Sequence, residues 1–396
     1  MAIDKLQTDA LSNTVTANIA SVAIGANVSI NSSTFVVGSG QIKATGITLP
    51  SNFGVSSNTT NLLENRNGQL FFNGRRVDLV NEYVAVYGYQ LGGFGTGVVY
   101  LSSADRITFS TGAYAASTIS NLSEARFCGG GPSDASVYGY TNGGYNSSAV
   151  VATCDRTTFA TSVTSAYSAG ALAAARYDHF SVSDGSVYGY VLGGYNSAFT
   201  VLSSVERRAF STGVTAAISA TLSAVRTSRM SQSLSDGSIY GYTMGGSSTG
   251  GVAGGVTTTD RLTFSTSAIA ASTASNVSVA RSDIGTVSDG AVYGYTCGGY
   301  NTSVAPVTTG DRTTFSTSAT AALTSANLSV ARAGLNGVSD GATYGYLSGG
   351  NTTNASDYVT TSDRLTFSTS VVAAATASNL PAARSFTASA FSDGAV

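Results

Sequence analysis

An internal repeat of about fifty residues is the feature that most restricts how this chain can fold. The tripeptide Tyr-Gly-Tyr occurs six times, at intervals of 50–53 residues, beginning at Tyr87, Tyr138, Tyr188, Tyr240, Tyr293 and Tyr344. A Gly-Gly pair follows two residues after each copy. A period of this length indicates a propeller or a solenoid, in which each unit buries its apolar surface against its neighbours.

Each unit carries three further markers. An acid-Arg pair occurs at Asp105-Arg106, Asp155-Arg156, Glu206-Arg207, Asp260-Arg261, Asp311-Arg312 and Asp363-Arg364, and Phe follows three residues after each Arg. A second arginine ends a run of small residues at Arg126, Arg176, Arg226, Arg281, Arg332 and Arg384. A Ser-Asp pair comes last, at Asp134, Asp184, Asp236, Asp289, Asp340 and Asp393. Because every unit has them, we interpret these positions as structural, forming hydrogen bonds or ion pairs that fix turns or join adjacent units.

The short β-branched and aromatic runs, separated by Gly, Ser and Asn, predict four short strands per unit. The order of an arginine, a strand, Asp-Gly, Tyr-x-x-Gly-Gly and an acidic strand that ends in an aromatic residue resembles the kelch repeat over about residues 82–396. This resemblance implies an all-β fold, a six-bladed kelch-like β-propeller. The chain lacks the tryptophan of the fourth kelch strand because it contains no Trp at all. We therefore expect the outer strand to be poorly anchored.

The repeat begins out of phase. Residues 84–87 already belong to a second strand, and the missing first strand is found at residues 384–391, followed by Asp393. We expect this C-terminal strand to complete the first blade, which closes the ring and removes the exposed edges of an open sheet.

Strand alternation places the connections after strands two and four on one face. The connections after strand two vary in sequence and cover residues 94–101, 145–153, 195–203, 247–259, 300–310 and 351–362. The Asp-Gly turns belong to the opposite face, from which residue 82 should enter the propeller. A stalk on one face and variable loops on the other is typical of a display or binding module.

Residues 1–80 do not repeat and form a separate β-rich N-terminal module, and the propeller follows at 81–396. Residues 61–76 predict a hairpin with turns at Asn67-Gly68 and Asn73-Gly74. The module is too small to bury a good core alone, so we expect a homo-oligomer, such as a trimer. The pattern Asn-Gly-x-Leu-Phe-Phe-Asn-Gly resembles segments of bacteriophage tail-fibre and other virion proteins. That resemblance implies a virion location and attachment to other virion proteins.

Composition excludes several classes of partner. Charged residues are 10% of the chain, well below the usual quarter, and the net charge is −2. We therefore expect no nucleic acid partner. We find no apolar stretch long enough for membrane insertion and no segment like a signal peptide. The three cysteines, Cys128, Cys154 and Cys297, follow no metal-binding spacing, and no glycine-rich phosphate loop is present, so we expect no metal or cofactor.

We also expect no enzymatic activity and assign no catalytic residue. The acids outside the repeat positions are Glu124, Asp178, Asp283 and Asp357, which lie in different blades, and we expect no convergence among them. His179 is the single histidine and is interpreted as structural, near the axis. A hydrolase or an oxidase is therefore disfavoured.

The candidate ligand-binding residues lie in the variable loops. They are aromatic residues and the asparagines that follow three of the tyrosines: Phe94, Tyr100, Tyr145, Asn146, Tyr195, Asn196, Phe199, Tyr300, Asn301 and Tyr358. A tyrosine ring with a neighbouring amide suits the faces and hydroxyls of sugars, and tyrosine is also common at protein interfaces. In the alternative interpretation, the tyrosine after Gly-Gly packs between blades.

The sequence hence favours a phage virion structural protein, a tail fibre or similar appendage, whose propeller head binds a host glycan or surface protein. The alternative is a bacterial kelch module outside any virion that binds protein or carbohydrate.

Overall fold

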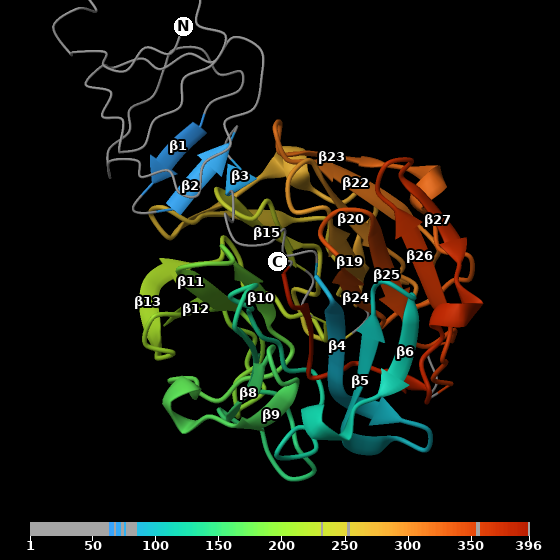
Figure 1. Ribbon diagram of the computed structural model, residues 1–396, viewed down its shortest axis with the longest axis horizontal. Coiled ribbons are helices and arrows are strands. Elements are labelled where there is room, and N and C mark those ends of the chain that lie inside the picture. Colours follow the sequence, from blue (N-terminus) through green and yellow to red (C-terminus); the bar gives the residue numbers. More distant parts are fainter. Residues whose placement is uncertain are drawn as a thin grey trace, which may run out of the picture.

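Six small β-sheets surround a common axis, as the blades of a propeller do, in the computed structural model of the chain (Figure 1). The structure describes residues 63–66, 69–72, 75–76 and 85–394, except 231–232, 252–253 and 354–356. Within these residues the fold is all-β: the helical segments are single 3-10 turns and no α-helix occurs. The prediction of an all-β six-bladed propeller is therefore confirmed.

The strands of each blade follow one another from the axis to the rim. The innermost strands are β29 (Ser389–Ser392), β10 (Phe180–Ser183), β14 (Ser233–Ser235), β19 (Gly285–Ser288) and β24 (Asn336–Ser339). The second strands are β4 (Tyr87–Gly95), β7 (Tyr138–Asn142), β11 (Tyr188–Leu192), β15 (Tyr240–Met244), β20 (Tyr293–Cys297) and β25 (Tyr344–Ser348). The third strands are β5 (Val99–Thr108), β8 (Cys154–Thr158), β12 (Ser204–Ala209), β16 (Thr259–Thr263), β22 (Gly310–Thr314) and β26 (Ser362–Thr366). The outermost strands are β6 (Ala113–Ala116), β9 (Val163–Ala166), β13 (Thr215–Thr221), β17 (Ala268–Ala271), β23 (Ala319–Ala322) and β27 (Val371–Ala374). Blades are numbered 1 to 6 in the order of their second strands.

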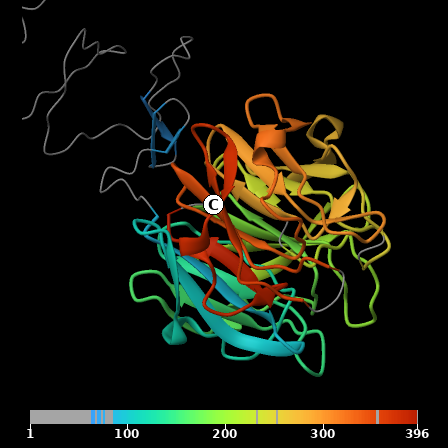
Figure 2. The ribbon, with the colours of Figure 1, turned by 90° about the vertical axis from the view of Figure 1, so that its right-hand side faces the viewer.

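The C-terminal strand closes the ring. β29 pairs antiparallel with β4, with Ser389 opposite Leu91 and Ser392 opposite Gly88. A short strand before it, β28 (Arg384–Ser385), pairs with the far end of β4. Figure 2 shows the red C-terminal strands beside the cyan strands of blade 1. The prediction that the C-terminal strand completes the first blade is confirmed.

The same aspartate turn links the first two strands of the blades, and blade 1 forms it from two distant parts of the chain. In blade 3, Asp184 Oδ1 accepts hydrogen bonds from three successive backbone N–H groups, including that of Val187 at 2.7 Å. In blade 1, Asp393 Oδ1 accepts from the N–H groups of Val86 at 2.6 Å and Tyr87 at 2.7 Å. The closure therefore reproduces the local turn of the other blades without a continuous backbone.

Tyrosine and phenylalanine rings join each blade to the next. The second tyrosine of every Tyr-Gly-Tyr is at most 1% exposed: Tyr89, Tyr140, Tyr190, Tyr242, Tyr295 and Tyr346. Each ring centroid lies 5.9–6.0 Å from that of the repeat phenylalanine of the following blade, in the same order Phe159, Phe210, Phe264, Phe315, Phe367 and Phe109. The glycine between the tyrosines also permits a close approach between blades, since a Cβ on Gly139 would lie 2.3 Å from the ring of Phe391 in β29. These stacks supply much of the apolar contact between blades.

A serine in the neighbouring blade completes four of these contacts. The buried tyrosine hydroxyl bonds with this serine in the pairs Tyr89–Ser162, Tyr190–Ser267, Tyr242–Ser318 and Tyr295–Ser370, at 2.7–2.9 Å. The arginine of the acid-Arg pair stacks on the first tyrosine of the motif and donates to the same serine, as Arg106 does to Ser162. All four serines adopt positive φ, between 54° and 56°. The two remaining blade junctions have Gly112 and Gly213 at this position.

The acidic residue of each acid-Arg pair forms a buried ion pair, but not with the arginine beside it. Its partner is the arginine that precedes the innermost strand of the same blade: Arg384–Asp105, Arg126–Asp155, Arg176–Glu206, Arg226–Asp260, Arg281–Asp311 and Arg332–Asp363. Successive strand residues point to opposite faces of the sheet, so the adjacent arginine reaches the next blade instead. These pairs fix the start of each blade against its third strand. Buried pairs of this kind specify geometry more than they add stability.

Blade 2 has no regular innermost strand. Its chain touches β7 only through single bridges, Gly130 with Asn142 and Ser133 with Gly139. Pro132 lies between them and has no backbone N–H to donate. A Cβ on Gly131 would lie 1.5 Å from the carbonyl oxygen of Tyr140, so the backbone approach here requires glycine. The run of glycines and proline thus replaces a strand with a close, irregular contact.

The expectation that the outer strand is poorly anchored was wrong. In four blades an asparagine after the outermost strand accepts a hydrogen bond from a backbone N–H at or next to the third strand, at 2.8–3.0 Å: Asn121, Asn276, Asn327 and Asn379. The next residue is buried in each case: Leu122, Val277, Leu328 and Leu380. An Asn-apolar pair therefore anchors the outer strand in these four blades.

Three short strands precede the propeller. β1 (Leu63–Arg66), β2 (Gln69–Phe72) and β3 (Arg75–Arg76) pair antiparallel in chain order. Their spacing agrees with the hairpin predicted over residues 61–76. The remainder of the module 1–80, its expected oligomerisation and the entry at residue 82 lie outside the described residues.

Candidate functional site

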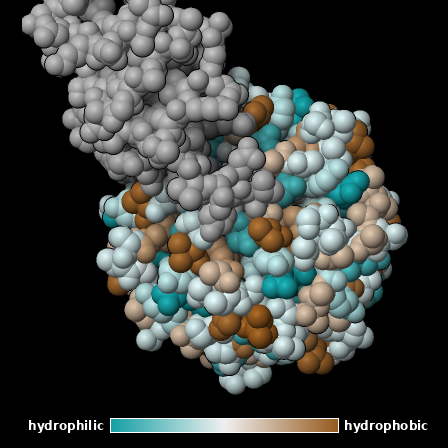
Figure 3. Space-filling model, viewed as in Figure 1, coloured by the Kyte–Doolittle hydropathy of each residue, from teal (hydrophilic) through white to brown (hydrophobic). Residues whose placement is uncertain are grey.

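The propeller has two unlike faces. The loop face is formed by the connections after the second and the outermost strands, and the turn face by the aspartate turns and the turns after the third strands. Val86, bound in the Asp393 turn, places the beginning of the described propeller on the turn face. On the face visible in Figure 3, apolar residues are scattered among pale residues of weak hydropathy.

Aromatic side chains from four blades form a continuous chain of ring contacts on the loop face, the aromatic arc. From blade 6 to blade 3 its members follow one another as Tyr358, Phe94, Phe127, Tyr100, Tyr145 and Tyr177, and the rings of Tyr195 and Phe199 both lie beside that of Tyr177. Neighbouring ring centroids are 4.1–6.5 Å apart. The arc crosses blades 6, 1, 2 and 3 and contains six of the residues that the sequence predicted as ligand-binding.

One member of the arc is far more exposed than the others. Phe199 is 59% exposed, whereas the other seven rings are partly buried against one another. Its φ of 56° lies in the left-handed region, which aromatic residues rarely adopt. Its backbone N–H donates to the carbonyl of Asn196 at 3.0 Å, which closes the loop beneath it. The loop therefore holds an apolar ring out into solvent on the arc.

Phe127 and Tyr177 belong to the arc but were missed by the sequence prediction. Each directly follows the buried repeat arginine of its blade. The equivalent residues of blades 4, 5 and 6 are Thr227, Ser282 and Ala333. Aligning the repeats could have found them, because blades 2 and 3 have a large aromatic residue where blades 4, 5 and 6 have a small one.

The predicted asparagines shape their own loops. The side-chain oxygens of Asn146, Asn196 and Asn301 each accept two backbone N–H groups of the residues that follow, at 2.7–3.1 Å. Asn146 also donates through Nδ2 to Glu124 Oε1 at 2.6 Å. These amides are therefore engaged within the loops that carry the arc.

Tyr300 and Asn301 lie outside the arc. Tyr300 is 2% exposed, and its hydroxyl donates to the backbone carbonyl of Thr353 at 3.1 Å and bonds with the Asn351 amide in blade 6. This is the packing between blades that the alternative interpretation described. Identical Tyr-Asn dipeptides thus take different positions in blades 2, 3 and 5.

A charged cluster lies near the axis on the loop side. Arg229 donates from Nε to Asp283 Oδ2 at 2.9 Å and stacks 4.3 Å above the Phe386 ring. Asp178 is 3% exposed, and burial raises its pKa to about 7, although Arg229 opposes the shift. The backbone N–H of Asp178 donates to Cys128 O at 2.7 Å. The expectation that Asp178 and Asp283 do not converge was wrong, because the second residue after each repeat arginine lies beside the axis.

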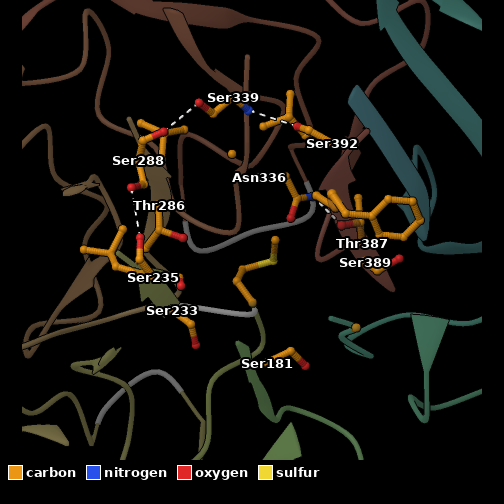
Figure 4. A pocket seen from close by; sticks show the side chains of 18 of the residues that line it. Ser181, Ser233, Ser235, Thr286, Ser288, Asn336, Ser339, Thr387, Ser389 and Ser392 are labelled. Atoms are coloured by element: carbon orange, nitrogen blue, oxygen red, sulfur yellow. Dashed lines mark hydrogen bonds between the residues drawn. The ribbon is translucent and has the colours of Figure 1, made fainter. Parts of the chain in front are cut away.

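A narrow cavity of about 120 Å³ follows the axis. Figure 4 shows hydroxyl and amide side chains of the innermost strands pointing into it. The serine before the aspartate turn donates from its hydroxyl to the backbone carbonyl of the equivalent serine in the preceding blade. The pairs are Ser183–Ser133, Ser235–Ser183, Ser288–Ser235 and Ser339–Ser288. No charged residue lines this cavity, so it offers hydroxyl groups without a titratable partner.

The histidine and the three cysteines are buried in the described residues. The part of the chain that the structure describes contains no group of three His, Cys, Asp or Glu side chains close enough to share a metal ion. His179 is fully buried, its Nε2 lies 3.2 Å from the carbonyl oxygen of Asn142, and burial lowers its pKa to about 4. The cysteines are free and buried, and burial raises the pKa of Cys297 to about 12. None of the described helical segments has the length and apolarity needed to cross a membrane.

Comparison with known proteins adds no relative: no family model matches this sequence, and a search of the curated proteins finds no match. The class that the fold defines is a six-bladed β-propeller with an aromatic loop face.

Proposed function

We propose that this chain is a structural protein of a bacteriophage particle, a tail fibre or similar appendage, whose propeller is a recognition head. The aromatic arc is the observation that carries the proposal. Rings from four blades gather on one face, while the propeller begins on the other. A head supported from the turn face would present the arc to the surface of a bacterial host.

The contrast between the two faces supports this role. Turn-face residues repeat from blade to blade, because the same aspartate turn links the first two strands of each blade. The loops on the other face differ in length and sequence, although the scaffold beneath them is constant. Rigid scaffolds that carry variable loops are typical of binding proteins.

Residues 1–80 would connect the head to other virion proteins. This part of the proposal depends on the likeness of residues 67–74 to phage tail-fibre segments, and it includes assembly as a homo-oligomer such as a trimer. The kelch likeness of residues 82–396 is also part of the proposal, with the Asn-apolar anchor in place of tryptophan.

Electron microscopy of particles with and without the gene tests the proposal. We expect particles that lack the protein to lose a projection and to adsorb poorly to their host. Mass measurement of the full chain should give an oligomer. Unaltered particles together with a monomeric full chain would refute the virion role and favour a bacterial propeller that acts outside any particle.

A further inference from the structure

The loop face carries almost no charge. The six connections between the second and third strands contain one charged residue, Asp357. The connections that lead to the next blade contain buried repeat arginines, the buried acids Asp178 and Asp283, and two side chains that reach the surface, Glu124 and Arg229. In the described part of the loop face, Arg229 is thus the one cationic side chain that a ligand could meet.

Each of these surface charges is already engaged. Arg229 is 26% exposed and is held by the Asp283 carboxylate. Glu124 accepts a hydrogen bond from the Asn146 amide, and Asp357 accepts from Thr352 and from the backbone of Thr353. A sulfate, phosphate or carboxylate on a ligand would lose its hydration here without gaining a free counter-charge.

The aromatic arc offers what an uncharged sugar needs. A pyranose ring has apolar C–H faces, which pack on aromatic rings, and a polar edge of hydroxyls. The arc provides a row of rings in steps of 4.1–6.5 Å, and Ser, Thr and Asn fill the loops around it. Sites that combine aromatic surfaces with a few neutral polar groups are typical of small polar ligands. A protein partner would usually add charged contacts at its rim, for which this face has no free groups.

We infer that the aromatic arc binds an uncharged oligosaccharide, with Phe199 as its most exposed stacking surface. This inference rests on the proposed recognition role and names the chemical class of the ligand. It also predicts binding that is insensitive to salt, because no free charge takes part.

An oligosaccharide array can test this inference with the full chain. Neutral oligosaccharides are printed beside the same chains carrying sialic acid, sulfate or phosphate, and binding is measured at about 50 mM and about 500 mM NaCl, where screening differs strongly. We expect binding to neutral members, weaker binding to their acidic counterparts, and a change of less than about twofold with salt. Phe199→Ala should weaken binding about five- to thirtyfold, as expected for the loss of an aromatic contact. Val187→Ala is the matched control, since Val187 is an apolar residue of the turn face that is 48% exposed, and it should bind normally.

The outcomes separate the two proposals. Preference for acidic oligosaccharides, or binding that falls steeply with salt, would overturn the inference and leave the recognition role intact. Binding to host cells that is lost after protease treatment but survives periodate would identify a protein partner and also overturn it. Failure to bind both the array and intact host cells would refute the recognition role itself.

Discussion

Replacing Asp393 by alanine should open the ring at one defined junction. Asp393 is 6% exposed, and its carboxylate accepts two backbone hydrogen bonds, at 2.6 Å and 2.7 Å, from residues more than 300 positions away. Hydrogen bonds to a charged group contribute about 1.5–3 kcal/mol each, so the pair contributes about 3–6 kcal/mol. The solvent access of Val86 lowers this to about 2–4 kcal/mol.

The matched variant is Asp184→Ala, which removes the same turn in blade 3. There the backbone still connects β10 with β11, so the two strands stay together after the turn loosens. In blade 1 no backbone turn joins β29 to β4, so beyond the β28 pairing and the Arg384–Asp105 ion pair the strand is held by its own hydrogen bonds and by the Asp393 turn. We therefore expect Asp393→Ala, but not Asp184→Ala, to separate an innermost strand from its blade.

Hydrogen exchange followed by mass spectrometry measures this difference. Amides of β29 and of the paired β4 should exchange much faster in Asp393→Ala, with blades 3 to 5 unchanged. Asp393→Asn keeps an acceptor oxygen and should give an intermediate result. The reasoning is refuted if β29 stays as protected in Asp393→Ala as β10 does in Asp184→Ala.

Three further predictions concern buried groups. Tyr295→Phe removes the hydroxyl that bonds with Ser370 at 2.7 Å but keeps the ring stack, so it should lower the free energy of unfolding by about 1 kcal/mol. Tyr295→Ala, which removes the ring as well, should lower it by about 3–5 kcal/mol. Denaturant unfolding measures both, and equal losses would show that the ring stack adds no stability. The pKa of Asp178 is raised to about 7, so its contribution to stability is present below about pH 3.8 and is lost as pH rises through 7. At pH 8, Asp178→Asn should therefore exceed the unmodified protein in free energy of unfolding by up to about 4 kcal/mol. Near pH 4 the two proteins should have similar free energies of unfolding. The pKa of His179 is lowered to about 4, which has the opposite effect: its contribution to stability is present above about pH 6.5 and is lost as pH falls through 4. His179→Gln should therefore reduce the fall in melting temperature at acid pH. An unchanged fall would show that His179 is not its source.

Most of the fold could be predicted because its repeat markers have fixed spatial meanings. Tyr-Gly-Tyr identifies the second strand of every blade, and the phase offset at Tyr87 requires a strand from elsewhere, which residues 389–392 supply. Blade 2 departs from the pattern where Pro132 and its neighbouring glycines prevent a regular strand. The spacing of markers thus determined the architecture, and local backbone chemistry determined its exception.

Partners across blades were harder to predict. Asp105 and Arg106 are adjacent in sequence, yet strand alternation sends them to opposite faces, where they meet Arg384 and Ser162. The outer-strand anchor was missed because its asparagine looks like an ordinary turn residue until its partner strand is known.

The candidate site was predictable only in part, because loop residues depend on what neighbouring blades provide. Tyr145 and Tyr300 share the same local motif, but Tyr145 is a member of the aromatic arc, whereas the hydroxyl of Tyr300 bonds with Asn351 and Thr353. Asp178 and Asp283 are far apart in the sequence, and only the closed ring of blades brings both residues close to the propeller axis.

The borrowed strand of blade 1 has a consequence for biosynthesis. While the ribosome is still making the later blades, the first blade lacks its innermost strand, and the partial ring exposes an unpaired edge at β4. Two nascent chains on one polysome could exchange these edges, each lending its late strand to the other. Tail-to-head intertwined dimers should therefore be the characteristic misfolded product, and they should become more abundant when translation of the later blades is slowed.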